Sequence, residues 1–363
     1  MSEQKYLRET PCGTICGTDC QWPGVAAYKG IRYATAERWA YPEAVTHWDG
    51  VYEATASGAC CYQPRSFYNE AEMPEKAFYY KEFRLGETYT YSEDCLFLNI
   101  WTPADAGPES KLPVIFYIHG GGFTGGCGHE KHFDGPVWPT KGCVAVTINY
   151  RLGPMGFVCL PELAEEAGFT GNYAFLDQLA ALQWARANIA AFGGDPNNIT
   201  IMGQSAGAMS VQQLVLSPIT RGLFSKAVMS SGGGVSQMLT AKPAEAHYPF
   251  WKQVMETAGC STLAEFRALA PARLFAAWDA VRTSSRVWAV SPWWMAVSRS
   301  RPAPRRWLPT NSTISLTSSA SPARISFRPT STRWLRTGAP GTPTAMAGSS
   351  TASSPVMTVV PGI

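Results

Sequence analysis

Apolar residues follow distinct spacings along this chain of 363 residues, and each spacing predicts a different element. Residues 112–118 and 144–151 form apolar runs, which are typical of strands buried on both faces of a parallel sheet. Residues 93–101 alternate apolar and polar positions and lead into a Thr-Pro pair, which predicts a strand with a stop. Residues 172–192 have helical spacing closed by a Gly-Gly pair, which predicts an amphipathic helix.

Further segments continue the same alternation of strand and helix. Residues 27–39 predict a short strand pair and a turn, whereas residues 198–202 and 224–230 predict strands. Residues 206–215 predict a helix between those last two strands. Strands that alternate with helices imply right-handed crossovers and a largely parallel sheet, so the expected class is α/β.

The stretch Gly203-Gln-Ser205-Ala-Gly207 lies between the predicted strand and the predicted helix. In this setting a Gly-x-Ser-x-Gly sequence is typical of a nucleophile elbow, because glycines let strand and helix approach closely while a sharp turn exposes the serine hydroxyl. Ser205 is therefore the candidate catalytic nucleophile. The alternative is an ordinary serine in a glycine-rich turn.

A second candidate feature follows the strand predicted at 112–118. His119 precedes three consecutive glycines, whose backbone N–H groups are unobstructed by side chains and suit an oxyanion site. We expect Gly121 and Gly122 to share an oxyanion with the N–H of Ala206 at the start of the helix. The alternative is a flexible glycine turn. His119 precedes the serine, and we expect it to brace the loop rather than act as a base.

The net charge of +3 conceals a strong asymmetry along the chain. All 27 acidic residues lie at or before Asp279, whereas ten arginines and no lysine follow it. Residues 1–280 therefore carry −7, from 20 basic and 27 acidic residues, and the remainder carries +10. A basic tail rich in Ser, Pro and Arg is typical of a nucleic-acid-binding or disordered extension, and it is also what a shifted reading frame produces.

The histidines and cysteines give no metal-binding pattern. His129 and His132 are candidate ligands, but no third ligand lies near them in the sequence, so we expect no metal and no cofactor. Asp177 and Gln178 are expected on the helix surface or in a supporting role. We expect free thiols, because zinc-type pairing is missing among the ten cysteines at positions 12, 16, 20, 60, 61, 95, 127, 143, 159 and 260.

Apolar runs also bear on the membrane question. None approaches the length that spans a bilayer, and the first eight residues lack the apolar core of a signal peptide. We therefore expect a cytoplasmic protein with no membrane partner.

Several motifs together resemble the type-B carboxylesterase family, which includes bacterial para-nitrobenzyl esterases and the cholinesterases. They cover roughly residues 10–280, and they are Glu93-Asp-Cys-Leu-Phe-Leu-Asn99, His119-Gly-Gly-Gly-Phe123, Asn149-Tyr-Arg-Leu-Gly153, Asn188-Ile-Ala-Ala-Phe-Gly-Gly-Asp-Pro196 and Gly203-Gln-Ser-Ala-Gly207. The resemblance implies an α/β-hydrolase fold with a mostly parallel central sheet flanked by helices. It also implies Ser205 as nucleophile, with Gly121, Gly122 and Ala206 as oxyanion donors, acting on a small-molecule ester.

The resemblance further implies an acid and then a histidine after the serine. Here the sequence departs from the pattern, since only His247 follows Ser205 and no acidic residue follows Asp279. Neither lies where the later strands of the sheet would deliver a catalytic group. No triad acid and no triad histidine are identifiable, and the fold is expected to be incomplete on its C-terminal side.

A shifted reading frame explains the departure. Trp and Met each have one codon, so Pro292-Trp-Trp-Met-Ala296 is encoded CCN TGG TGG ATG GCN. Read one nucleotide earlier, these bases permit Pro-Val-Val-Asp-Gly, which looks like a segment of the family. The last nine codons likewise permit Pro-Gly-Asp-Asp-Ser-Gly-Ala-Trp-His, which resembles the segment with the catalytic histidine. We expect a one-nucleotide slip between residues 279 and 292.

These observations predict a carboxylic-ester hydrolase with its core at 1–280 and an out-of-frame, poorly ordered tail at 281–363. The 363-residue chain itself is expected to be impaired. One alternative is a non-catalytic, esterase-like binding module, although such a module would more naturally lose Ser205 and keep its C-terminal half. Another takes the basic tail as a nucleic-acid-binding arm, which we do not favour.

Overall fold

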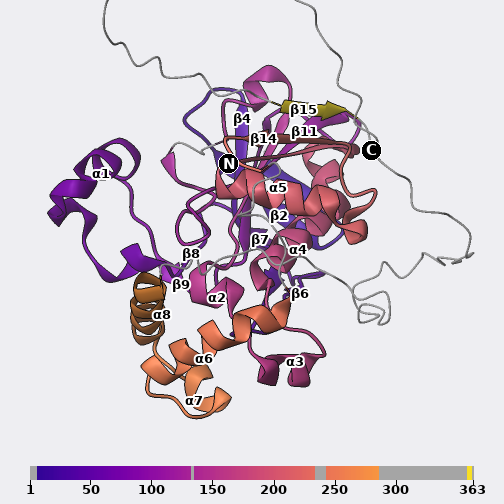
Figure 1. Ribbon diagram of the computed structural model, residues 1–363. Coiled ribbons are helices and arrows are strands. Elements are labelled where there is room, and N and C mark those ends of the chain that lie inside the picture. Colours follow the sequence, from indigo (N-terminus) through magenta and orange to yellow (C-terminus); the bar gives the residue numbers. More distant parts are fainter. Residues whose placement is uncertain (1–5, 132–134, 234–242, 286–357, 362–363) are drawn as a thin grey trace, which may run out of the picture. The chain divides into compact units, whose positions relative to one another are not determined.

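An eight-stranded mixed sheet is the centre of the computed structural model, which describes residues 6–131, 135–233, 243–285 and 358–361 (Figure 1). The described residues belong to one compact unit. In spatial order the strands are β15 (Thr358–Pro361), β14 (Lys226–Ser230), β13 (Gly194–Gln204), β11 (Leu112–Ile118), β12 (Val144–Ile148), β10 (Phe97–Pro103), β4 (Val25–Arg32) and β3 (Thr18–Asp19).

The four middle strands are parallel, as the alternation of strand and helix predicts. β11 pairs in parallel with β12 and β13, and β13 pairs in parallel with β14. The outer strands β10, β4, β3 and β15 pair antiparallel, so the sheet is mixed rather than parallel throughout. In the register of the middle strands, Ile118 lies opposite both Ile148 and Gly203. The segments that follow β11 and β13 therefore leave the sheet at the same edge.

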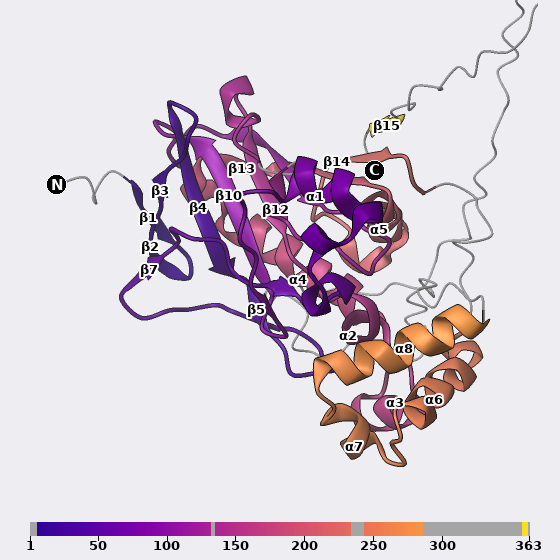
Figure 2. The ribbon, with the colours of Figure 1, turned by 90° about the vertical axis from the view of Figure 1, so that its left-hand side faces the viewer.

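Helices α4 (Tyr173–Asn188) and α5 (Ala206–Leu216) lie beside these middle strands (Figures 1 and 2). α4 is buried on most of its surface, including Asp177 and Gln178 at 0% exposure. The expectation of an amphipathic helix is therefore wrong, and of the two positions expected for Asp177 and Gln178 the surface one is excluded while the supporting one holds. A helix enclosed by its neighbours has no wide polar face, and its few polar side chains need partners inside the protein.

The predicted strand pair near the N-terminus is arranged differently from expectation. β4 pairs with β10 and β3 and not with the segment that follows it. The smaller sheets contain β1 (Leu7–Thr10), β2 (Gly13–Cys16) and β7 (Val51–Glu53), then β5 (Ala34–Thr35) with β6 (Glu43–Ala44), and β8 (Cys60–Cys61) with β9 (Tyr91–Ser92).

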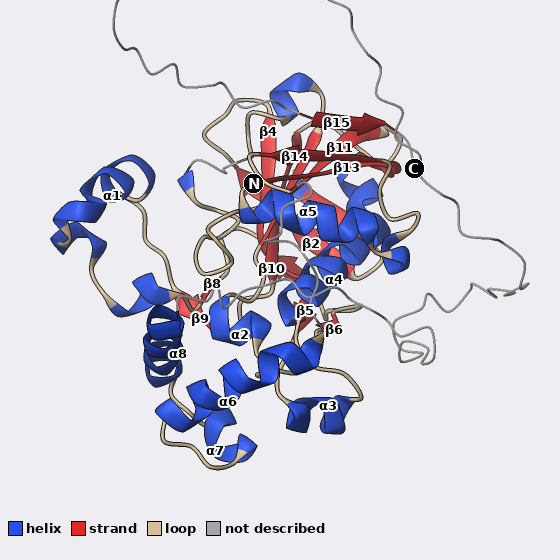
Figure 3. Cartoon of the chain, viewed as in Figure 1, coloured by secondary structure: helices blue, strands red, loops and turns tan. Residues whose placement is uncertain are grey.

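The remaining helices are short, apart from the last one, and Figure 3 marks all of them in blue. They are α1 (Ala77–Phe83), α2 (Gly153–Phe157), α3 (Pro161–Ala167), α6 (Tyr248–Thr257), α7 (Leu263–Arg267) and α8 (Pro271–Ser285). α8 runs through the predicted boundary at residue 280, and most of the predicted tail lies outside the described residues. Among the residues with a description, no helix combines the length and the apolar character needed to cross a bilayer.

Candidate active site

Ser205 lies at the corner between β13 and α5, as the motif predicts. Its backbone has φ 56° and ψ −122°, a conformation that costs a non-glycine residue about 1–3 kcal/mol and is concentrated at functional sites. Its N–H donates to the carbonyl of Ser230 on β14 at 2.9 Å, which fixes the turn. The Ser205 side chain makes no capping bond to α5. Ser205 is also partly exposed, so the sharp turn leaves its side chain outside the hydrogen bonding of the helix.

The two glycines of the motif permit the close approach of strand and helix. A Cβ atom on Gly203 would lie 2.4 Å from the carbonyl of Gly207. A Cβ atom on Gly207 would lie 2.1 Å from the carbonyl oxygen of Ile118, at the end of β11. Real Cβ atoms essentially never come this close to backbone atoms. Any side chain here would push α5 away from the sheet edge and move Ser205.

The glycine loop after β11 lies directly against this corner. A Cβ atom on Gly120 would lie 3.2 Å from Cβ of Ser205 and 2.6 Å from the carbonyl oxygen of Gln204. Gly121 and Gly122 follow with φ values of 101° and 61°, which favour glycine. Ala206 is the first residue of α5, where N–H groups have no partner within the helix. The structure thus brings the predicted loop and the predicted nucleophile together.

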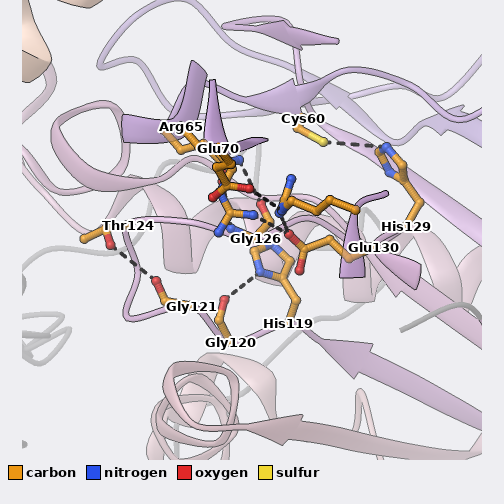
Figure 4. Close-up of polar contacts among 12 residues, drawn as sticks. Cys60, Arg65, Glu70, His119, Gly120, Gly121, Thr124, Gly126, His129 and Glu130 are labelled. Atoms are coloured by element: carbon orange, nitrogen blue, oxygen red, sulfur yellow. Dashed lines mark hydrogen bonds and ion pairs between the residues drawn. The ribbon is translucent and has the colours of Figure 1, made fainter. Parts of the chain in front are cut away.

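His119 braces the glycine loop, as expected from its position. Its side chain is buried, and its Nδ1 lies 2.8 Å from the carbonyl oxygen of Gly120, to which it donates (Figure 4). The ring stacks on Tyr150 with centroids 4.3 Å apart, and the Tyr150 hydroxyl donates to the His119 carbonyl at 2.8 Å. These contacts hold the imidazole in a supporting position.

Gln63 holds the far end of the loop, a role that sequence reasoning did not find. Its side-chain amide donates to the Gly126 carbonyl at 3.1 Å and accepts from the Gly126 N–H at 3.0 Å. The same side chain is buried and also donates to the Cys61 carbonyl. A glutamine among polar loop residues gives no signal in one sequence, because its partner lies 63 positions away.

A buried ion pair supports the region behind the loop. Arg151 donates to both carboxylate oxygens of Asp177, at 2.8 and 2.7 Å, and also to the carbonyl of Ala40 at 2.8 Å. Burial acts to lower the pKa of Arg151, but the Asp177 carboxylate outweighs it and raises that pKa. Gln178 donates to the Ser210 hydroxyl on α5 at 3.0 Å. Asp177 and Gln178 therefore support the elbow helix and its surroundings from inside the protein.

No catalytic base or acid is found beside Ser205 in the described part of the chain. Within residues 6–131, 135–233 and 243–285, no hydrogen bond joins the Ser205 hydroxyl to a histidine or a carboxylate. His247 ends a short 3₁₀ helix ahead of α6, and Asp279 forms an ion pair with Arg282 on α8. The codons that would supply the acid and the histidine in a shifted frame lie outside the described residues.

The structure does bring two further side chains of metal-ligating types to His129, contrary to the expectation of no third ligand. Cys60 and Cys127 lie beside it, and Cys60 Sγ is 3.6 Å from His129 Nε2 (Figure 4). Burial acts to raise the pKa of the Cys127 thiol, but hydrogen bonds with Cys60 and His129 lower it to about 6. Sequence spacing missed the group because Cys60 is 67 positions from Cys127. All ten cysteines are free, as expected, and His132 lies outside the described residues.

Arginines and glutamates surround this group on the side of α1. Glu130, which Figure 4 shows beside Arg65 and Glu70, accepts from Arg65 at 2.7 Å and forms an ion pair with Arg84. Arg84 also contacts Glu70 at 3.1 Å. The side chains of Glu130 and Arg84 are only 6% and 8% exposed. Each buried charge therefore has a partner of opposite sign, as burial requires.

Comparison with known proteins agrees with this geometry. The sequence model of the "Carboxylesterase family" matches residues 4–285. The chain is 40% identical over 253 residues to a para-nitrobenzyl esterase of Bacillus subtilis, covering 68% of this chain and 47% of that protein. It is 41% identical over 253 residues to an acylcarnitine hydrolase of Mus musculus, covering 67% and 43%. The chain spans about half the length of the curated relatives it matches.

Solved structures agree in fold. A thermophilic pNB esterase superposes with a TM-score of 0.66 at 34% identity, covering 78% of this chain and 55% of that one. A Geobacillus stearothermophilus carboxylesterase gives 0.62 at 36% identity, covering 77% and 53%. The fold is that of the α/β-hydrolases, with Ser205 at its strand-to-helix corner and the glycine loop beside it. The chain belongs to the carboxylesterase family.

Proposed function

We propose that this chain carries the nucleophile and the oxyanion hole of a carboxylic-ester hydrolase. Ser205 is the nucleophile, and the N–H groups of Gly121, Gly122 and Ala206 stabilise the oxyanion that forms when its hydroxyl attacks an ester carbonyl. The observation that carries the proposal is the close approach of the glycine loop to the corner, where a Cβ atom on Gly120 would lie 3.2 Å from Cβ of Ser205, because an oxyanion bonded to the serine must also touch its donors.

The reaction proceeds through an acyl-enzyme. A base removes the Ser205 proton, the alkoxide oxygen attacks the ester carbonyl, the alcohol leaves, and water then releases the acid. We assign the base and its acidic partner to a reading frame that differs from the printed one after residues 279–292. On this proposal residues 1–280 are the hydrolase core, and residues 281–363 contribute no catalytic group. Loss of triad members leaves roughly 10³–10⁴-fold catalysis over water where the rest of the fold is intact.

The same proposal covers the substrate class, the partners and the cellular compartment. We infer a small-molecule ester as substrate, with no nucleic-acid partner and no cofactor. Ten free cysteines, eight of them buried, suit a reducing compartment, which supports a cytoplasmic location.

Hydrolysis of para-nitrophenyl acetate tests the proposal in two proteins. One is the 363-residue chain. The other is the protein from the same gene with its reading frame moved back by one nucleotide at a point within codons 279–292 and then read to the next stop codon. We expect near-background rates from the first and clear turnover from the second. In the second protein, Ser205→Ala should lower kcat by roughly a millionfold, as loss of a triad serine does. Ser261→Ala, at an exposed serine, serves as control.

Two results would contradict it. Turnover that survives Ser205→Ala would exclude this serine as the nucleophile. Strong turnover by the 363-residue chain would mean that His247 or another described group serves as the base.

A further inference from the structure

Three metal-binding side chains meet where the glycine loop contacts β8. Cys60 belongs to β8, whereas Cys127 and His129 follow the last glycines of the loop. The two sulfur atoms and one ring nitrogen all lie within 4.8 Å of one another. Cys60 and Cys127 are 1% and 2% exposed. The group lies outside the machinery assigned to Ser205, and the proposed hydrolysis does not use it.

The distances fit a tetrahedral metal centre. Zinc binds sulfur at about 2.3 Å and imidazole nitrogen at about 2.0–2.1 Å, which places two such ligands about 3.5–3.6 Å apart across a tetrahedral angle. Cys60 Sγ and His129 Nε2 are 3.6 Å apart. Two sulfur atoms bound to one zinc ion lie about 3.8 Å apart. No pair among the three ligand atoms here is more than 4.8 Å apart, so a small side-chain rotation brings the two sulfurs to that spacing.

The donor set selects the metal. Two thiolates and one imidazole favour Zn²⁺ among the common cellular ions, because Mg²⁺ and Ca²⁺ prefer oxygen ligands. The nearest carboxylate in sequence, Glu130, is already bound by Arg65 and Arg84. Water is therefore the natural fourth ligand. Binding takes both cysteines as thiolates and His129 as neutral imidazole, and any protons these groups hold pass to solvent, so the two negative sulfurs balance the charge of the ion.

We propose that Cys60, Cys127 and His129 bind one Zn²⁺ ion, which fastens β8 to the loop that carries Gly121 and Gly122. The neighbouring side chain of Gln63 already joins the same two segments through Gly126. The metal adds a second, stronger link at the same junction. Its role is structural, because it restrains the loop and takes no part in proton transfer at Ser205.

Cobalt replaces zinc in such sites and makes the binding visible. The full 363-residue chain, purified under reducing conditions and treated with a chelator, is titrated with Co²⁺. We expect thiolate-to-cobalt charge-transfer absorption and the visible bands of tetrahedral cobalt, both saturating at a single equivalent and both abolished by Zn²⁺. Absence of thiolate-to-cobalt absorption in the reduced chain would overturn the proposal.

Variants assign the ligands. Cys60→Ser, Cys127→Ser and His129→Asn should each weaken Co²⁺ binding roughly a hundredfold or more, because each removes one of three protein ligands. Cys143→Ser, which alters a half-exposed cysteine outside the group, should bind as the parent does. Unchanged binding in a folded Cys60→Ser or Cys127→Ser variant would overturn the site.

A measurement on the parent chain avoids dependence on variants that fail to fold. Alkylation followed by mass spectrometry should label Cys60 and Cys127 at least tenfold more slowly with Zn²⁺ than with chelator, while Cys143 reacts equally in both. Equal labelling of Cys60 and Cys127 in the two conditions would refute the site. A Cys60–Cys127 disulfide that persists under reductant and blocks metal binding would also refute it.

Discussion

The glycine loop is held differently on its two sides. Toward the elbow it packs through backbone alone, since a methyl group on Gly120 or on Gly207 would collide with the carbonyl oxygen of Gln204 or of Ile118. Toward β8 and α1 it is held by side chains, with Gln63 bonded to Gly126 and Glu130 bound by two arginines. The elbow side depends on the absence of side chains, whereas the β8 side depends on bonds between side chains and their partners.

The difference separates two tasks. The elbow side positions Ser205, the proposed nucleophile, and backbone packing is suited to this because it has no side-chain rotamers to vary. The β8 side holds the loop by hydrogen bonds and ion pairs, which cost free energy when one partner is removed and the other stays buried. We therefore expect any added side-chain atom on the elbow side to destabilise the fold. On the β8 side we expect the loss in free energy of unfolding to grow with the charge that a substitution leaves unpaired.

The largest effect should come from Gly207→Ala. Its Cβ would lie 2.1 Å from a backbone oxygen, so α5 or β11 must shift, at a cost of more than about 3 kcal/mol in the free energy of unfolding. Urea unfolding followed by circular dichroism measures the loss. Gly107→Ala, where the added methyl meets nothing within 4 Å, should change stability by less than about 0.5 kcal/mol. Equal losses in free energy of unfolding in Gly207→Ala and Gly107→Ala would mean that backbone packing at the elbow does not depend on the missing side chain.

Glu130→Gln should have the next largest effect, on the side-chain-held side. It leaves Arg65 and Arg84 without their shared carboxylate, although both keep an ion pair with Glu70, and we expect a loss of about 2–3 kcal/mol. The control is Glu166→Gln, which breaks an exposed pair with Arg267 and should cost at most about 1 kcal/mol. If both substitutions cost the same, burial does not set the strength of the Glu130 contacts.

Gln63→Ala should cost less because it removes no charge. The buried N–H and carbonyl of Gly126 lose their partner, which costs about 1–2 kcal/mol in urea unfolding. In the enzyme with the restored frame, kcat should fall while folding persists, because the loop with Gly121 and Gly122 loses one attachment. Gln21→Ala, at an exposed glutamine, should alter neither quantity. An unchanged kcat in Gln63→Ala would mean that this bond does not position the loop.

The smallest effect on stability is expected at the exposed N-terminal cap of α7, away from both sides of the glycine loop. Backbone N–H groups of Ser261 and Thr262 lower the pKa of Glu265, which completes the capping box of α7. A lowered pKa in the folded state adds stability above the ordinary glutamate pKa and loses it as the pH falls through the folded value. Between about pH 5 and pH 3, Glu265→Gln should therefore lose less thermal stability than the parent. An identical pH dependence would exclude a contribution from this cap.

Local patterns predicted the elements that form the sheet edge with Ser205. The apolar run at 112–118 is β11 residue for residue, and the glycine motif places Ser205 between β13 and α5. These features depend on neighbours in the chain, which one sequence displays directly. Local spacing misjudged α4, because an apolar face seen in sequence does not reveal whether other elements cover the remaining faces.

The sequence by itself determined the α/β class, the place of the Ser205 motif between strand and helix, the glycine loop after β11 and the break in the pattern after Asp279. Tertiary structure alone decided the partners of Asp177, the attachment of Gly126 by Gln63 and the meeting of Cys60, Cys127 and His129. The reason is physical. A turn or a strand is encoded by adjacent residues, whereas a contact between distant side chains exists only after the sheet has fixed its register and brought separate loops to one edge.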